Sequence, residues 1–144
     1  MKNILIVYHS QSGNTENMAK AIADGAKAAG AKVTLKKAAE ANTNDLLNCD
    51  LIAIGTPNYF SYMAGMVKDF FDRVWASVRG KLENKPYFVF GSYGGGGQPG
   101  LESVEKICSG LGMKKACDSL GVQRTPTKEN LAACKEAGKK LAGL

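Results

Sequence analysis

The fold of this 144-residue chain is decided by one stretch near its start, Ile4-Leu5-Ile6-Val7-Tyr8-His9-Ser10-Gln11-Ser12-Gly13-Asn14-Thr15. Residues 4–8 are continuously apolar and partly β-branched, which is typical of a strand covered on both faces of a parallel sheet. Residues 10–15 are rich in turn-forming types. Apolar residues then recur at three- and four-residue spacing, and this period predicts a helix that ends near Gly30.

The same succession of strand and helix repeats along the chain. The patterns predict further strands at residues 32–36, 51–54, 87–90 and, more weakly, 115–118, and helices at residues 63–78, at 101–111 and after Thr125-Pro126-Thr127. Strands that alternate with helices indicate an α/β fold, a doubly wound parallel sheet with right-handed crossovers. Five strands fit the order 2-1-3-4-5, which places the alternating second run and the weak fifth run at the edges. We interpret residues 1–144 as one domain.

The composition is that of an ordinary globular protein, with 44% hydrophobic and 22% charged residues. No apolar run approaches the ~20 residues that a membrane span requires, and the first strand lacks the cleavage site of a signal peptide. We therefore expect a cytoplasmic protein that does not bind membranes. The formal net charge is +6, but lysines and arginines occur at most in pairs. Such scattered charges are typical of solvated helix faces, and we expect no nucleic-acid binding.

The cysteines and the single histidine offer no metal site. Cys49, Cys108, Cys117 and Cys134 form no C-x-x-C pair, which zinc and iron–sulfur sites in short chains usually contain. We interpret them as free, small apolar residues. His9 is expected to pack at the end of the first strand, although a role in tuning the charge of a nearby ligand stays open.

Ligands of open parallel sheets bind beyond the carboxyl ends of the strands, where the strand order reverses. That point lies here between the first and third strands, so the loops 9–15, 55–62 and 91–98 are expected to meet there. The first loop is a candidate phosphate site, formed by Ser10, Gln11, Ser12, Gly13, Asn14 and Thr15. Hydroxyl groups and the free N–H groups of the following helix favour a dianion, and glycine lets the backbone approach it closely.

The pattern Ser10-x-Ser12-Gly13-x-Thr15, directly after a buried strand and before a helix, resembles the signature of the flavodoxin family. The order and length of the elements resemble short-chain flavodoxins over essentially the whole chain. This resemblance implies a flavodoxin-like fold, one bound flavin mononucleotide (FMN) and a function in electron transfer.

The other two loops supply candidates for the flavin ring. Three of four consecutive residues in the second loop are aromatic, and aromatic faces pack well on a flat isoalloxazine ring. The candidates from this loop are Thr56, Pro57, Asn58, Tyr59 and Phe60, of which the last two are expected to contact the ring. The third loop contributes Ser92, Tyr93, Gly94 and Gly95. Its run of glycines resembles the corresponding loop of flavodoxin-like NAD(P)H:quinone reductases.

Two functions stay open. The first is an electron carrier between redox protein partners, and the second is an enzyme that reduces a quinone or a similar acceptor with NAD(P)H. The basic charge weakens the resemblance to flavodoxin carriers, and so does the absence of glycine from residues 56–62, where many flavodoxins have one. The shortness of the chain weakens the reductase hypothesis, because the chain lacks room for the loop insertion of the quinone reductases.

We place the electron carrier narrowly first and identify no catalytic residue, because a flavin supplies the redox chemistry itself. A monomer or weak dimer is expected. Phe71 and Trp75 widen the apolar face of their helix and form a candidate dimer contact, although deeper burial explains them as well.

Overall fold

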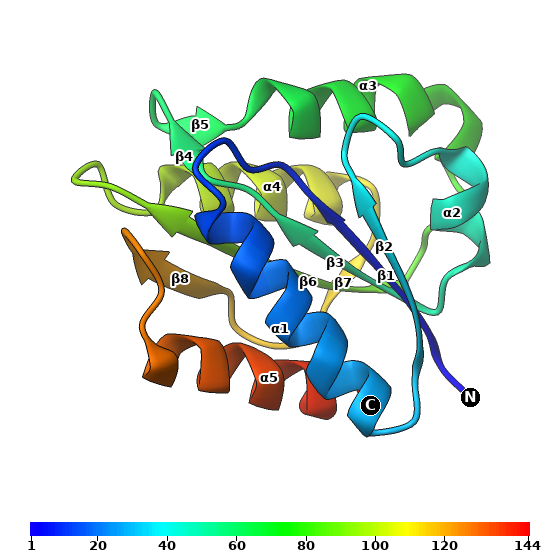
Figure 1. Ribbon diagram of the computed structural model, residues 1–144. Helices are drawn as coiled ribbons and strands as arrows, with labels where there is room; N and C mark the ends of the chain where they lie inside the picture. The colour runs from blue at the N-terminus through cyan, green and yellow to red at the C-terminus, as the bar shows by residue number, and fades with distance from the viewer.

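The computed structural model describes residues 1–144, and it has a central sheet with helices on both faces (Figure 1). In chain order the elements are β1 (Asn3–Tyr8), α1 (Asn14–Ala28), β2 (Lys32–Lys37), α2 (Thr43–Asn48), β3 (Leu51–Gly55), β4 (Asn58–Tyr59), β5 (Tyr62–Met63), α3 (Gly65–Val78), β6 (Pro86–Tyr93), α4 (Pro99–Gly110), β7 (Lys114–Lys115), β8 (Leu120–Gln123) and α5 (Lys128–Ala142). None of these helices is long and apolar enough to cross a lipid bilayer.

The central sheet is parallel and runs in the order β2-β1-β3-β6, followed by β7 and β8, which pair with different halves of β6. The expected order 2-1-3-4-5 is confirmed, with β6 as the fourth strand and β7 with β8 as the fifth. The inner strands β1, β3 and β6 are almost wholly buried, whereas the edge strand β2 is partly exposed. The contrast follows from their sequences, because only a strand covered on both faces is apolar throughout.

The fifth strand differs from its sequence prediction. The prediction of one strand at residues 115–118 is wrong. The chain instead forms two strands, β7 and β8, with residues 116–119 between them. Tyr87 of β6 pairs with Lys115, and Phe90, three residues later, pairs with Leu120, which is five residues after Lys115. The partner segment has two residues too many to stay paired, so the connecting residues leave the sheet. Gly121 in the middle of β8 hides the apolar alternation that marks a strand.

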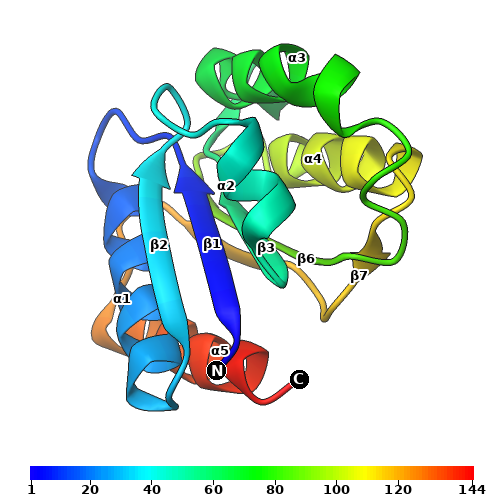
Figure 2. The same ribbon diagram turned by 90° about the vertical axis from the view of Figure 1, so that its right-hand side faces the viewer.

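Side chains of the sheet alternate between two apolar layers. On one face α1 and α5 cover residues such as Ile4, Ile6 and Phe88. On the other face α2, α3 and α4 cover residues such as Leu5 and Val7. Figures 1 and 2 show the two groups of helices on opposite sides of the sheet. Both faces are therefore closed, and the loops at the carboxyl edge are left to carry a ligand site.

Two glycines allow α1 and α5 to pack closely. A Cβ at Gly25 would lie 1.9 Å from the carbonyl oxygen of Lys135, and one at Gly138 would lie 2.0 Å from that of Ile22. Any side chain at either glycine would push the helices apart. The contact thus holds α1, the helix that begins at the first loop, firmly against its neighbour.

The segment after β3 is more ordered than an open loop. Residues 58–63 form the two-stranded hairpin β4–β5, so Met63 belongs to β5 and α3 begins at Gly65. The expected helix start at residue 63 is therefore wrong by two residues.

The sequence pattern does not predict α2. This helix has six residues, too few to show a helical period, and its visible signal is a capping box. The Asn42 side chain accepts a hydrogen bond from Asp45 N–H, and the Asp45 carboxylate accepts one from Asn42 N–H.

β6 continues through residues 91–93, which the sequence pattern assigns to a loop. A Cβ at Gly91 would lie 1.7 Å from the carbonyl oxygen of Thr56, so a residue with a side chain could not pass the end of β3 here. Glycine serves close backbone approach at this point, not flexibility.

Candidate functional site

A cavity of about 310 Å³ lies at the carboxyl edge of the sheet, where the strand order reverses. Twelve residues line it: Ser10, Gln11, Ser12, Asn14, Thr15, Pro57, Asn58, Tyr59, Ser92, Tyr93, Gly94 and Arg124. The structure thus brings the three expected loops together, and it adds the residue that follows β8.

The start of α1 offers unused hydrogen-bond donors to this cavity. No side chain caps the helix, and its first backbone hydrogen bond runs from Asn17 N–H to the Gly13 carbonyl (3.0 Å). The N–H groups of Asn14, Thr15 and Glu16 therefore have no acceptor within the protein. A phosphate dianion would accept hydrogen bonds from such groups, and the helix dipole would favour its charge. The donor set fits the phosphate of FMN.

The turn before α1 is shaped by one glycine. Gly13 has a φ of 93°, in the left-handed region, and its N–H donates to Ser10 Oγ (3.0 Å). A Cβ at this position would meet no atom within 4 Å, so the requirement for glycine is conformational, not steric. Since Ser10 Oγ accepts that bond, its own proton stays available for a ligand.

Thr15 and Ser92 join the first and third loops. The Thr15 hydroxyl, which is buried, accepts a hydrogen bond from Ser92 N–H (3.2 Å). The Ser92 hydroxyl donates to the carbonyl oxygen of Arg124 (2.6 Å). Ser92 thereby ties the end of β6 both to α1 and to the end of β8, and its hydroxyl is already engaged within the protein.

The second loop is fastened to α4. Asn58 Oδ1 accepts a hydrogen bond from Gly100 N–H (2.7 Å), and Ser103 Oγ accepts one from Met63 N–H (3.0 Å). Thr56 is fully buried, and its hydroxyl accepts a bond from Ala64 N–H (2.9 Å). Most polar groups of this loop therefore hold the loop itself in place.

The tip of the hairpin lies outside the cavity lining. Phe60 and Ser61 have φ values of 52° and 63°, a left-handed conformation that is uncommon for residues with a side chain. The Phe60 side chain is fully exposed and does not line the cavity. Of the two aromatic residues expected at the flavin ring, the structure places only Tyr59 in the lining.

Tyr59 connects the second loop to the first. Its ring lies edge-on to His9, with centroids 6.3 Å apart, and it packs partly on the core beneath α3 and α4. Burial raises the pKa of Tyr59, and a backbone hydrogen bond with Gln11 acts in the opposite direction. Burial also lowers the pKa of His9, which lies at the end of β1.

The third loop presents one aromatic ring and open backbone. Tyr93 is half-buried in the lining, and its hydroxyl accepts a hydrogen bond from the Gln98 side chain (3.3 Å). No atom would lie within 4 Å of a Cβ at Gly94 or at Gly95, so their backbone is open to a ligand. Gly95, however, lies outside the cavity lining.

Twelve residues thus line the cavity, and eleven of them are among the sequence candidates. The candidates outside the lining are Gly13, Thr56, Phe60 and Gly95. Arg124 is the residue that sequence reasoning missed. Its signal was its place directly after the fifth strand, which the misplaced strand at 115–118 concealed.

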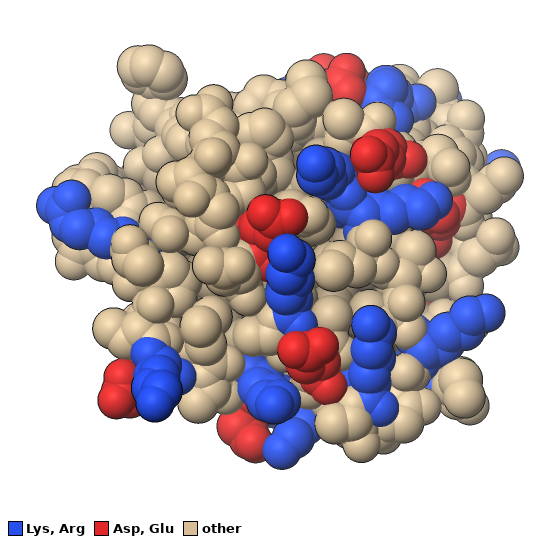
Figure 3. Space-filling view, in the orientation of Figure 1, with Lys and Arg blue, Asp and Glu red and all other residues tan.

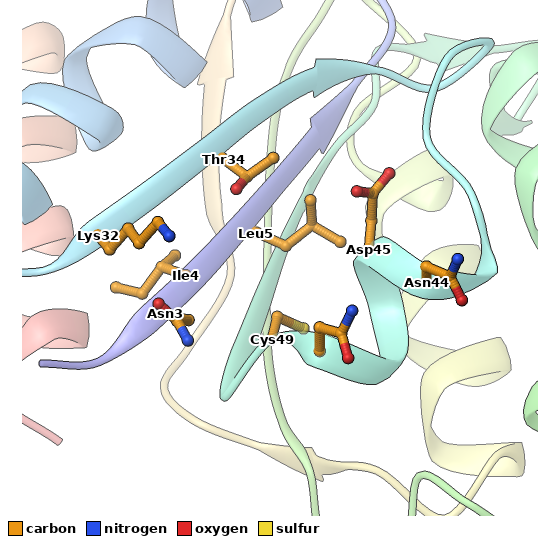
Figure 4. Close-up of a pocket in the computed structure, with 9 residues that line it drawn as sticks. Asn3, Ile4, Leu5, Lys32, Thr34, Asn44, Asp45 and Cys49 are labelled. Carbon is orange, nitrogen blue, oxygen red and sulfur yellow. The ribbon is translucent and has the colours of Figure 1, made fainter.

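A second hollow, of about 240 Å³, lies between β1, β2 and the short helix α2 (Figure 4). Asp45 in its lining already binds Lys36 Nζ (2.9 Å) and completes the cap of α2. The hollow contains none of the residues of the three loops, so we assign no ligand to it.

The cysteines and the candidate dimer contact lie away from the cavity. All four cysteines are free, and Cys49, Cys108 and Cys134 are buried, as expected for small apolar residues. Phe71 is buried, whereas Trp75 is 49% exposed and stacks under the guanidinium of Arg79. A dimer contact at α3 stays a prediction.

Charges of both signs are mixed over α1 and α5 in the lower half of Figure 3, whereas the upper left, toward the carboxyl ends of the strands, is mostly uncharged. The face therefore shows no continuous basic patch of the kind that binds nucleic acids.

Comparison with known proteins agrees with the fold and with the position of the cavity. The family profile described as Flavodoxin matches residues 6–138. A flavodoxin of Aquifex aeolicus (strain VF5) is 29% identical, over 99% of this chain and 86% of the relative. NAD(P)H dehydrogenase (quinone) 3 of Rhizobium meliloti (strain 1021) is 36% identical over 78% of this chain, which spans only 65% of that relative. A solved flavodoxin from the domain Archaea has a TM-score of 0.90 and 26% identity, over 98% of this chain and 96% of its own. The chain belongs to the flavodoxin family, the family of FMN-binding electron-transfer proteins that the first loop indicated.

Proposed function

We propose that this chain holds one FMN in the cavity at the carboxyl edge of the sheet and passes electrons between redox partners. The observation that carries the proposal is the uncapped start of α1, whose free N–H groups open into a cavity lined by Ser10, Ser12 and Thr15. An anionic group accounts for donors that the protein leaves unused. FMN, when bound, supplies the redox chemistry, and the protein supplies placement and electrostatics.

The residues divide this task between the three loops. The first loop binds the phosphate through N–H and hydroxyl donors. Tyr59 and Tyr93 come from the second and third loops, and both rings are half-buried in the lining. We assign them to the two faces of the flavin ring, where they provide apolar area and exclude water. Phe60 is left out of this role because its side chain lies outside the cavity.

A second candidate function is reduction of a quinone or similar acceptor with NAD(P)H. It is favoured by the sequence identity to the Rhizobium quinone dehydrogenase and by a second loop that is held too firmly for easy backbone rearrangement. Against it stands the length of the relative, of which this chain covers 65%. The electron carrier therefore stays first.

One simple experiment distinguishes the two functions. FMN-loaded protein is mixed with NADH or NADPH without air and without a separate reductase, and the flavin absorbance is followed. A carrier is expected to keep its oxidised spectrum, because it receives electrons only from a protein partner. Rapid bleaching, faster than that of free FMN under the same conditions, would favour the reductase. Dithionite added at the end shows that the bound flavin is reducible.

A further inference from the structure

The cavity lining carries one charged residue. Among the twelve lining residues no aspartate or glutamate occurs, and Arg124 is the sole cation. None of the ion pairs in the protein involves Arg124, so no carboxylate contacts its guanidinium directly. The lining therefore contributes one positive charge and no negative charge to a ligand in this cavity.

The backbone of Arg124 is held at the cavity rim by two hydrogen bonds to the end of β6. Its N–H donates to the Tyr93 carbonyl (2.7 Å), and its own carbonyl accepts from the Ser92 hydroxyl (2.6 Å). Its φ of 63° lies in the left-handed region, where a side chain is disfavoured. The neighbouring contacts over-determine this conformation, and they fix residue 124 beside two residues of the lining.

We propose that Arg124 stabilises the reduced form of bound FMN and so raises its reduction potential. This inference rests on the proposed function. The neutral oxidised ring gains two electrons and one proton on full reduction, so the ring takes on one negative charge at N1. A cation at the rim lowers the free energy of that anionic ring more than that of the neutral oxidised one. Arg124 is exposed, so water and salt screen the interaction and the effect is moderate.

Potentiometric titration of the FMN-bound protein tests the proposal. Arg124→Gln removes the charge and, like arginine, places a side chain on the left-handed backbone. It is expected to lower the two-electron potential by about 15–30 mV, which corresponds to a roughly three- to tenfold lower affinity for reduced relative to oxidised FMN. Arg124→Lys keeps the charge and should stay close to the wild-type potential. Lys128→Gln is the matched control, because it removes an exposed cation that is close to Arg124 in the sequence but does not line the cavity.

Two results would overturn the inference. One is an unchanged potential in Arg124→Gln; if affinity for oxidised and reduced FMN then falls equally, Arg124 belongs to the phosphate. The other is an equal drop in potential in Lys128→Gln, which would reveal a general effect of net charge. Fluorescence titration of the wild type with oxidised FMN separates these results from failure of the proposed function, in which no tight binding would occur.

Discussion

The first and second loops meet at one cavity, but they use their polar groups in opposite ways. The first loop leaves the initial N–H groups of α1 without acceptors, and its residues Ser10, Ser12 and Thr15 line the cavity. The second loop turns Asn58 and Thr56 inward, where they bind Gly100 and Ala64 of the protein itself. The difference supports the proposal that the first loop binds a ligand, whereas the second loop holds its own conformation.

The largest expected effect concerns binding by the first loop. Gly13→Val forces a β-branched residue into a left-handed conformation, at a cost of roughly 1–3 kcal/mol. Because the bound loop must keep this conformation, we expect the FMN dissociation constant to rise at least about tenfold. Fluorescence titration measures the change.

Gly30→Val is the matched control for this substitution. Gly30 has a φ of 94°, close to that of Gly13, and a Cβ there would also meet no atom within 4 Å. Its backbone strain is therefore the same, but it lies at the other end of α1, after the helix. We expect similar losses of apoprotein stability in urea and a loss of FMN affinity only at position 13. Equal FMN affinity in both variants would contradict a binding role for the first loop.

A smaller effect tests whether the second loop is stiff. Wild-type protein is expected to pass almost directly from oxidised to fully reduced FMN during stepwise anaerobic reduction, because Asn58 is fastened to Gly100 and cannot turn its backbone easily. Asn58→Gly removes the fastening and permits positive φ. We expect this variant to show, when half of the electrons for full reduction have been added, a long-wavelength absorbance. This absorbance belongs neither to oxidised nor to fully reduced FMN.

Asn58→Ala separates the two consequences of that change. It also leaves Gly100 N–H without its acceptor, at a cost of about 1 kcal/mol in the free energy of unfolding, but it adds no glycine. It should therefore lose stability like Asn58→Gly and keep the direct two-state spectrum of the wild type. If the wild type itself shows most of its flavin in the long-wavelength form during stepwise reduction, the second loop is not stiff.

The sequence predicted the sheet order well because the inner strands are continuously apolar and are separated by helical periods. It failed where local structure depends on contacts from elsewhere. β8 is stabilised by pairing with β6, although Gly121 interrupts its pattern. The six residues of α2 are too few to show a period. The extension of β6 depends on the space that Gly91 leaves for Thr56, which no local pattern reveals.

In the candidate site, too, features that depend on local sequence were predictable and those that depend on distant contacts were not. The place of the first loop in the cavity lining was predictable, since its residues are consecutive and directly follow a buried strand. The absence of Phe60 from the lining was not predictable, because it depends on the turn of the hairpin, where Phe60 is fully exposed. Arg124 was missed through the error in the fifth strand, since the residue after a parallel strand belongs to the ligand edge only once that strand is placed.

The central claim is that the first loop binds a phosphate, and comparison of FMN with riboflavin tests it most directly. The two ligands share the ring and differ in the phosphate, so the second and third loops should treat them alike. Two hydrogen bonds to a charged group, at about 1.5–3 kcal/mol each, predict binding of FMN at least about a hundredfold tighter than riboflavin. Fluorescence titration of the apoprotein gives both dissociation constants. Equal affinity for the two flavins would contradict the account.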